Sequence, residues 1–310
     1  MPDLIHTGSI VVDMVMTIDT VPTPGNEALA TTTHLVAGGG LNSMLAAQRS
    51  GLPVKFAGLV GTGPFGDMIA QTLADNELAS IYPRVAGTDS GFCVALVDKG
   101  GERTFITQVG AESEVSFEHL SQIQINDDDL VYVSGYSLAT QTNASGLARW
   151  LATVPESTVV FLDPSPLVCQ LPEKVFQPLI ARASIVSCNL REARHITGQT
   201  RAKDCASRLA ELLRPHAYAV VRAGKEPTLI SSADNPQSVI SVPTFPVDAV
   251  DTNGAGDTHA GVVLASIAHG LSLEESVRRA NAAAAISVTR SGPMSAPTAE
   301  EVEEFLAEHR

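Results

Sequence analysis

The chain has 310 residues, of which 44% are hydrophobic, so it can bury the core of one large domain or two ordinary ones. Its formal net charge of −14 repels nucleic acids and anionic membranes, and we expect neither as a partner. No stretch approaches the roughly 20 apolar residues of a membrane span, and the N-terminus lacks the basic and apolar pattern of a secretion signal.

The cysteines occur without a C-x-x-C pair or metal-ligand spacing, at positions 93, 169, 188 and 205. Isolated cysteines of this kind are typical of reduced thiols, so we expect a cytoplasmic protein. Because a nucleotide is itself an anion, it would need local helix N-termini and a divalent cation to bind against the negative charge of this chain.

The first predicted strand, residues 4–13, ends at Asp13. Asp13 either closes the strand as a turn residue or binds substrate hydroxyls, because the carboxyl ends of strands face the ligand crevice of an α/β sheet. The turn-rich sequence VPTPGNE at 21–27 then divides residues 14–36 into two arms, which predicts a β-hairpin-like excursion without a helix.

A glycine run, Gly38–Gly40, leads through Asn42 into a predicted helix over 43–50 that Gly51 and Pro53 end. The glycines either form a plain turn or allow the backbone to approach a ligand closely. In the second case the side-chain amide of Asn42 can donate hydrogen bonds to hydroxyl groups and accept them.

The following strand, residues 54–60, leads into a G-x-G-x-x-G sequence over 61–66, which is typical of dinucleotide-binding enzymes. That alternative needs an acid at the end of a second strand about 20 residues later. Residues 81–88 instead contain Pro83 and Gly87 and are typical of a loop or an edge strand. We therefore set a nicotinamide-dependent oxidoreductase aside.

Residues 91–97 and 103–107 have the pattern of strands around the turn DKGG, which indicates a β-hairpin. With residues 14–36 this hairpin can form a small sheet apart from the main domain. Its strands carry Phe92, Val94 and Phe105, which a small open sheet cannot bury alone. We expect a second subunit to cover one face of the sheet.

Beyond residue 115, strands and helices alternate without a linker or a repeat. The predicted strands are 130–135, 158–163, 185–188 and 218–222, and the predicted helices are 143–152, 173–182 and 203–213. This alternation predicts an α/β fold with a doubly wound, mostly parallel sheet and helices on both faces.

The most informative stretch is Asp251-Thr252-Asn253-Gly254-Ala255-Gly256-Asp257, which opens directly into an apolar helix. Its small residues leave the first N–H groups of the helix bare, and with the helix dipole they predict a site for a phosphate-like anion. Asp257 either caps the helix or accepts a proton from the group that attacks phosphorus. With an ordinary pKa of about 3.9 it would be ionised at neutral pH.

The pattern D-T-x-G-A-G-D over 251–257 resembles the C-terminal signature of the ribokinase-like carbohydrate kinases, the phosphofructokinase B family. The glycine run with Asn42 resembles the N-terminal signature of the same family. The resemblance covers essentially the whole chain. It implies an ATP-dependent kinase that transfers the γ-phosphoryl group to a hydroxymethyl-type alcohol of a sugar or sugar derivative.

The resemblance also implies how the chain is divided. The α/β core that binds nucleotide and substrate would comprise residues 1–13, 37–87 and 110–310. A β lid over the substrate would comprise residues 14–36 and 88–109. In this family the lid often doubles as a dimer interface, so we expect a homodimer.

The resemblance assigns three groups of site residues. The phosphoryl-transfer group is Asp257, as general base, with Gly254, Ala255 and Gly256. The substrate-binding group is Asp13, Gly39, Gly40 and Asn42. The ATP-binding group is Asn189, Glu192, Arg222, Gly224 and, near the adenine, Asn281.

Several of these residues also have a purely structural interpretation. Asn189 and Glu192 have the spacing of a capped helix start, whereas the family's N-x-x-E motif handles Mg²⁺, which Glu192 would reach through metal-bound water. Asn281, which begins a predicted Ala-rich helix, is either near the adenine or a buried asparagine bonded to local backbone. Asp251 would help bind a monovalent cation such as K⁺, as its counterpart does in several family members.

Some positions depart from the ribokinase pattern. Met44 replaces a small residue, the glycine run is one residue shorter and lacks a lysine, and Gly135-Tyr136 stands where ribokinases carry an acid. These departures argue against ribose as the substrate. Because Tyr136 or Phe92 could stack on a base, a nucleoside kinase remains an alternative. A catalytically idle sugar-binding protein is a third, against which the intact Asp257 counts.

Overall fold

Alternating apolar side chains build two hydrophobic cores, one on each face of a large sheet. In β8 (Leu130–Ser134), Leu130 and Tyr132 belong to one core, whereas Val131 and Val133 belong to the other. Because both faces of the sheet are covered, its central strands are apolar on both sides rather than amphipathic. The structure is a computed structural model that describes residues 2–292 and 294–309.

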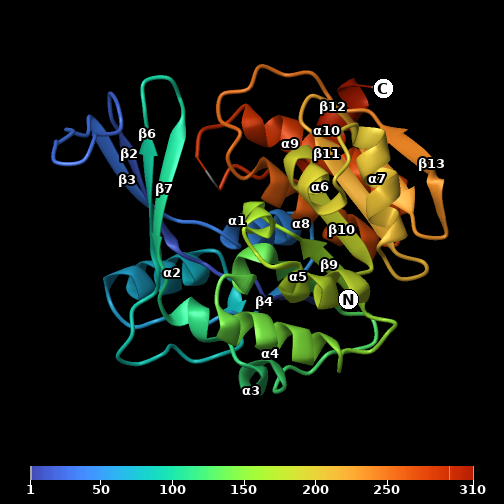
Figure 1. Cartoon of the computed structure of the whole chain (residues 1–310), viewed down its shortest axis with the longest axis horizontal. Coiled ribbons are helices and arrows are strands. Elements are labelled where there is room, and N and C mark those ends of the chain that lie inside the picture. The colour runs from blue at the N-terminus through green and yellow to red at the C-terminus, as the bar shows by residue number, and fades with distance from the viewer. Residues whose placement is uncertain (1, 293, 310) are drawn as a thin grey trace.

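The large sheet is mostly parallel. Besides β8, its strands are β1 (Leu4–His6), β4 (Val54–Phe56), β5 (Ala79–Ser80), β9 (Val159–Asp163), β10 (Ile185–Asn189), β11 (Tyr218–Ala223), β12 (Glu226–Ser232) and β13 (Asn235–Val242). They lie in the order β13-β12-β11-β10-β9-β8-β1-β4-β5 (Figure 1). Neighbours from β11 to β5 pair in parallel, and β12 and β13 are antiparallel.

Helices cover both faces of this sheet. They are α1 (Leu41–Arg49), α2 (Pro64–Asp75), α3 (Phe117–Leu120), α4 (Gln141–Leu151), α5 (Glu173–Arg182), α6 (Leu190–Thr197), α7 (Ala202–Glu211), α8 (Ala255–Ala268), α9 (Leu273–Val288) and α10 (Ala299–Glu308). Helices α1, α2, α8, α9 and α10 pack into one core and α3 to α7 into the other. The predicted doubly wound α/β fold is confirmed. Among the described helices, none has the length and apolar character that a membrane span requires.

The strand order reverses at β1, which fixes the position of the ligand crevice. From β1 the chain reaches β4 and β5 on one side, then returns to β8 on the other side and continues outward to β11. In an open parallel sheet, such a reversal leaves a crevice outside the carboxyl ends of the strands. The segments that follow β1, β8, β9, β10 and β11 all begin at this edge.

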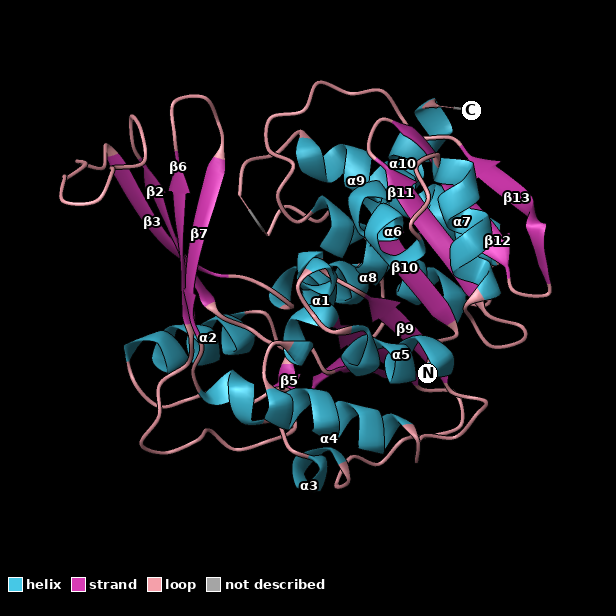
Figure 2. Cartoon of the chain, viewed as in Figure 1, coloured by secondary structure: helices cyan, strands magenta, loops and turns pink. Residues whose placement is uncertain are grey.

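A second, small sheet stands beside the core (Figure 2). Its strands are β2 (Val12–Thr17), β3 (Thr32–Ala37), β6 (Phe92–Val97) and β7 (Arg103–Gln108), in the order β3-β2-β6-β7. We call this sheet the lid. The central pair β2–β6 is parallel, and the two outer pairs are antiparallel.

The single strand predicted over residues 4–13 is wrong. The chain leaves the large sheet after His6, because the Gly8 N–H turns back to His6 Nδ1 at 3.2 Å and the Thr7 hydroxyl bonds to the Tyr132 carbonyl at 2.9 Å. Strand pairing resumes at Val12, in the lid. Asp13 is therefore a lid residue rather than the end of a core strand.

The register of the lid strands gives each face a different character, because directly paired residues point to the same side. One face, which we call the outer face, carries Met14, Met16, Leu35, Val94, Leu96 and Ile106. The inner face carries Asp13, Cys93 and Arg103, and Arg103 contacts the core. Phe105 pairs with Ala95 and thus lies on the inner face, so it does not share a face with Val94.

Two further elements differ from the sequence prediction. The hairpin formed by β12 and β13 lies outside the predicted elements, since Pro227, Pro236 and its polar residues suit only an exposed edge. Asn281 lies in the middle of α9 instead of at a helix start. That helix begins earlier because the Ser272 side chain caps it by accepting the Glu275 N–H.

Close packing between α1 and α8 generates a prediction about stability. A Cβ added at Gly261 would lie 2.4 Å from the Ser43 carbonyl oxygen and 2.7 Å from Ala46 Cβ. We expect Gly261→Ala to lower the free energy of unfolding by about 1–3 kcal/mol, measured by urea unfolding. Without the clash, alanine in a helix interior would raise the free energy of unfolding by roughly 0.5–1 kcal/mol. A higher free energy of unfolding in the variant would therefore contradict the close packing at Gly261.

Candidate active site

The turn before α8 forms a cradle of backbone N–H groups at the crevice. Gly254 is the N-cap and has a φ of 75°, a left-handed conformation that favours glycine. The Thr258 N–H bonds to the Gly254 carbonyl at 2.8 Å, so the helix begins directly after this residue. The N–H groups of Gly256 and Asp257 precede that bond and have no acceptor within the helix. They are positioned to bind an anion.

Asp257 does not cap α8. It is the third residue of the helix, and the N-cap position belongs to Gly254, which makes no side-chain capping bond. The Asp257 carboxylate instead accepts a hydrogen bond from Asn42 Nδ2, with Oδ2 at 3.3 Å. Asn42 Oδ1 is buried and has no hydrogen-bond donor among the described residues. The fold thus joins the two predicted signature motifs and leaves an acceptor available to a substrate hydroxyl.

The glycine run lies against the segment that leaves β1. Gly39 has a φ of 63°, and a Cβ on it would lie 2.8 Å from the Ser9 carbonyl oxygen. A Cβ on Gly40 would lie 2.6 Å from His6 Cε1. His6 is buried, and its Nε2 is 2.8 Å from the Ser43 hydroxyl. Only glycines permit this approach, which places the backbone of the run beside Asn42.

Asp13 approaches the same run from the lid. A Cβ on Gly38 would lie 2.1 Å from Asp13 Oδ2, so the carboxylate lies directly over the glycine backbone. Within the described residues no hydrogen bond or ion pair engages this carboxylate. Asp13 is free to accept hydrogen bonds from a hydroxylated ligand between the lid and the core.

Asn189 and Glu192 form the capping box that one interpretation predicted. The Glu192 carboxylate accepts from the Asn189 backbone N–H at 2.9 Å and from Asn189 Nδ2 at 2.6 Å, and the Glu192 N–H donates to Asn189 Oδ1 at 2.9 Å. The pair therefore begins α6 at the carboxyl end of β10. The buried Glu192 carboxylate faces the same edge of the sheet as the anion site.

Arg222, at the end of β11, forms an ion pair that the sequence analysis missed. Its Nη2 lies 3.1 Å from Oδ2 of Asp163, which ends β9. The two side chains are 15% and 12% exposed. A Cβ on Gly256 would lie 2.4 Å from Arg222 Nη1, so the guanidinium lies against the anion-binding turn. Asp163 could have been recognised in the sequence as a candidate site residue, because it is an acid at the end of a predicted parallel strand.

Negative charge is crowded at this edge of the sheet. Burial, and then the charge of Asp163, raise the pKa of Asp257 to about 7, against the effects of Asn42 and Arg222. Burial raises the pKa of Asp13 to about 6, and burial with the Asp163 charge raises that of Glu192. The ordinary pKa expected for Asp257 is wrong, because the expectation ignored its removal from water.

Asp251 connects the lid to the anion-binding turn. Its Oδ1 accepts from Arg103 Nη2 at 3.0 Å and from the Asn253 N–H at 2.9 Å, and its Oδ2 accepts from the Gly292 N–H at 3.3 Å. Arg103 begins β7 on the inner face of the lid. This ion pair therefore crosses the crevice.

The remaining predicted ATP-binding residues are Asn281 and Gly224. The buried Asn281 amide accepts from the Thr228 hydroxyl at 2.8 Å and donates to the carbonyls of Val242 and Pro243. It is buried, as its structural interpretation predicted, but its partners lie 38 to 53 residues away in the sequence rather than in the local backbone. Gly224, with a φ of 70°, forms the turn between β11 and β12.

Tyr136 lies at the reversal of strand order, directly after β8, and is 51% exposed. Burial, and then the charges of Asp257 and Asp163, raise its pKa to about 12, so its ring belongs to the same electrostatic environment. Phe92, the other predicted stacking residue, packs against Phe65 with ring centroids 4.9 Å apart. Tyr136 is therefore the better placed of the two for a ligand.

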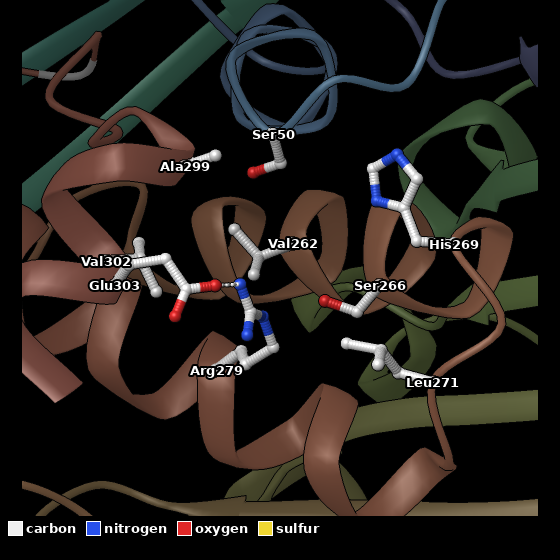
Figure 3. Close-up of a pocket in the computed structure, with 9 residues that line it drawn as sticks. All are labelled: Ser50, Val262, Ser266, His269, Leu271, Arg279, Ala299, Val302 and Glu303. Atoms are coloured by element: carbon white, nitrogen blue, oxygen red, sulfur yellow. Dashed lines mark hydrogen bonds and ion pairs between the residues drawn. The ribbon is translucent and has the colours of Figure 1, made fainter. Parts of the chain in front are cut away.

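A separate pocket lies at the other end of α8. Figure 3 shows it between α1, α8, α9 and α10, with an ion pair between Arg279 and Glu303 at its wall. Its volume is about 270 Å³, and none of the predicted site residues lines it. This pocket is therefore separate from the predicted site residues.

Comparison with known proteins identifies the family of this chain. Residues 1–299 match the family described as pfkB family carbohydrate kinase. The Escherichia coli protein named "Uncharacterized sugar kinase YegV" is 32% identical over 298 residues, covering 95% of this chain and 91% of that protein. The Thermotoga maritima ribokinase structure has a TM-score of 0.83 at 24% identity and covers 99% and 100% of the two chains.

An Escherichia coli structure solved with ATP and Mg²⁺ has a TM-score of 0.82 at 21% identity, with 100% of both chains covered. At this level of identity the structural likenesses establish the fold, whereas the match over nearly the whole chain establishes the family. The chain belongs to the pfkB family of carbohydrate kinases.

Proposed function

We propose that this kinase transfers the γ-phosphoryl group of ATP to a hydroxymethyl-type alcohol of a sugar or sugar derivative, with Asp257 as the general base. The observation that carries the proposal is the contact between Asn42 and Asp257. It joins the glycine run to the anion-binding turn, so a substrate hydroxyl and a phosphoryl group would meet beside the carboxylate.

The residues at the crevice suit ATP and Mg²⁺. Hard cations take oxygen ligands, and the carboxylate of Glu192 supplies them at the edge of the sheet that carries the N–H cradle of Gly256. Mg²⁺ would neutralise the triphosphate, which the crowded acids otherwise repel. We assign Glu192, with Asn189 as its partner, to this ion through bound water.

Each of the predicted site residues then has a defined role in the reaction. Asp13 and the free Oδ1 of Asn42 orient the substrate alcohol through hydrogen bonds. The backbone N–H groups of Gly256 and its neighbours hold the transferring phosphoryl group. Asp257 accepts the hydroxyl proton on its carboxylate. Closure of the lid over the crevice excludes water, which would otherwise compete as the phosphoryl acceptor.

A potassium ion at Asp251 would have to share this carboxylate with the Arg103 guanidinium. Both oxygens of this carboxylate already accept hydrogen bonds, and one of them pairs with the Arg103 guanidinium. The lid arginine thus supplies the positive charge that the resemblance attributes to a monovalent cation. We assign no step of the reaction to K⁺.

The substrate class follows from the crevice wall. The acid expected for a ribokinase is replaced by Tyr136, whose half-exposed ring favours an apolar or planar group on the substrate. A nucleoside is therefore the second candidate. A panel of sugars and nucleosides assayed for substrate-dependent ADP release tests both.

We further propose a homodimer formed through the outer face of the lid. That face is apolar, with Leu35 45% and Ile106 63% exposed, and a monomer rarely leaves such a continuous sheet surface uncovered. A cytoplasmic location is part of the proposal and is supported by the free thiols of all four cysteines.

The role of Asp257 predicts the behaviour of Asp257→Asn. We expect turnover to fall by roughly 10²–10⁴-fold, about 3–5 kcal/mol of barrier, because the base is lost. In the wild type, kcat/KM should fall below about pH 7, where the raised pKa leaves Asp257 protonated. Steady-state rates across pH measure both effects.

Thermal unfolding of the same variant provides the control. Because the pKa of Asp257 is about 7 in the folded state and about 3.9 when unfolded, the folded wild type binds the extra proton between these values. Its stability should fall as pH rises through that window, and Asp257→Asn should lose the part of this dependence that Asp257 contributes, while the smaller window of Asp13 remains. Full activity in a normally folded variant would refute the mechanism.

The role of Asp13 predicts a defect confined to the sugar. Asp13→Ala should raise the KM for the sugar by about 10- to 100-fold, since charge-assisted hydrogen bonds contribute about 1.5–3 kcal/mol each. The KM for ATP should stay unchanged. Asp19→Ala, which removes an exposed acid from the same lid segment, is the matched control. Unaltered sugar kinetics in Asp13→Ala would leave Asp13 with a structural role only.

The dimer proposal predicts sedimentation as a dimer at micromolar concentration. Ile106→Glu places a charge on the outer face and should give monomers. Ile240→Glu, which changes an exposed isoleucine of β13 in the large sheet, should remain dimeric. A wild type that sediments as a monomer would exclude the lid interface.

A further inference from the structure

The ion pair between Asp163 and Arg222 lies where the reaction is proposed to occur. Asp163 ends β9 and Arg222 lies near the end of β11, on either side of Asn189 in β10. The distance from Nη2 to Oδ2 is 3.1 Å. A pair removed from water in this way has to repay the desolvation of both charges. Its position at the carboxyl edge, rather than in either core, calls for a functional reason.

The guanidinium has more donors than the chain uses. One Nη2 donor goes to Asp163, and Arg222 Nε is buried without an acceptor among the described residues. Nη1 lies against the backbone of Gly256, where any side chain would collide with it. Buried donors normally find partners, so unused ones beside an anion-binding turn indicate a missing anion.

The segment that carries Asp163 is held in a strained conformation. Ser165 has a φ of 57° and a ψ of 164°, in a region that is almost reserved for glycine, and it is buried. The Ser165 N–H donates to Asp163 Oδ1 at 3.0 Å, and its hydroxyl accepts from the Leu167 N–H. Gly135 packs so closely on Pro164 that a Cβ would lie 1.7 Å from the Pro164 carbonyl oxygen. Such strain persists where the surroundings fix one geometry.

Both oxygens of Asp163 are therefore committed, one to the strained turn and one to Arg222. Without this restraint the flexible arginine would be free to swing toward the other acids of the crevice, Glu192 and Asp257. Pairing with Asp257 would neutralise the proposed base.

We propose that Asp163 is a positioning residue for phosphoryl transfer: its carboxylate holds the Arg222 guanidinium against Gly256, beside the transferring phosphoryl group and away from Asp257. This inference rests on the proposed function. In phosphoryl transfer, charge spreads over the equatorial oxygens, and a preorganised guanidinium stabilises that charge without reorganising. Asp163 acts on the reaction only through Arg222 and through its own charge.

A double-mutant cycle with Asp163→Asn and Arg222→Gln tests the proposal. Loss of a preorganised donor costs about 10²–10³-fold in kcat, and we expect Asp163→Asn, which only releases the donor, to lose roughly 10- to 100-fold. At a pH high enough to ionise Asp257 in every variant, the double variant should have the kcat of Arg222→Gln alone, because Asp163 then acts only through the arginine. Asp204→Asn, which removes an acid from the exposed pair with Arg201, is the matched control.

A second readout distinguishes positioning from a merely structural role. The negative charge of Asp163 contributes to the raised pKa of Asp257. In Asp163→Asn the acid limb of kcat/KM should therefore move to lower pH, and so should the pH window in which stability falls. The stability profile needs no substrate and no turnover.

Three outcomes would overturn the proposal: a wild-type kcat in Asp163→Asn, additive losses in the cycle, or an unmoved acid limb. Should Asp163→Asn not fold, Asp163→Glu decides, because it keeps the charge but displaces the guanidinium. Its kcat should fall while the acid limb stays in place, and a wild-type kcat in that variant would overturn the proposal. Absence of substrate-dependent ADP release in the wild type would instead contradict the proposed function.

Discussion

The crowding of carboxylates around one guanidinium is the constraint on which the site depends. Asp163 and Glu192 follow adjacent parallel strands, and Asp257 and Asp13 approach the same edge from α8 and from the lid. Burial raises the pKa of Asp13, and burial together with the charge of Asp163 raises the pKa of Glu192 and of Asp257. Within the described residues, Arg222 is the cation that forms an ion pair with one of these four acids, Asp163. A divalent cation bound with the nucleotide at this edge would relieve this repulsion, so binding of the metal ion and ionisation of Asp257 would be physically linked.

The positions of these acids and of Arg222 follow from the topology of the sheet rather than from the local sequence. Parallel strands bring their carboxyl ends to one edge, and the reversal at β1 opens that edge to a ligand. The loops that follow different strands then contribute one or two residues each to the predicted site. The lid completes the enclosure from outside, and its two faces have separate tasks. The inner face presents Asp13 and Arg103 to the crevice, whereas the outer face is left apolar.

The elements with strong periodicity could be predicted from the sequence, and so could the turn before α8. Continuous apolar runs indicated β8 to β11, and the small residues 254–256 indicated the turn before α8. What could not be predicted are the meetings between distant segments. The Asn42–Asp257, Asp163–Arg222 and Arg103–Asp251 contacts each depend on register and burial, which no local pattern encodes. The same is true of the pKa of Asp257, because it reflects removal from water.

The parallel pair at the centre of the lid has a consequence for the order of folding. It joins Val12 to Phe92, and the intervening chain contains β4, α2 and β5 of the core. Closing so long a loop costs entropy before any contact is gained, and parallel pairing across it is intrinsically slow. We expect the nucleotide-binding half to be formed first and the lid to assemble last. A folding molecule would then pass through a stage in which its apolar lid strands are unpaired. During that stage, a lid strand can pair with a strand of a second folding molecule instead of with its own partner strand.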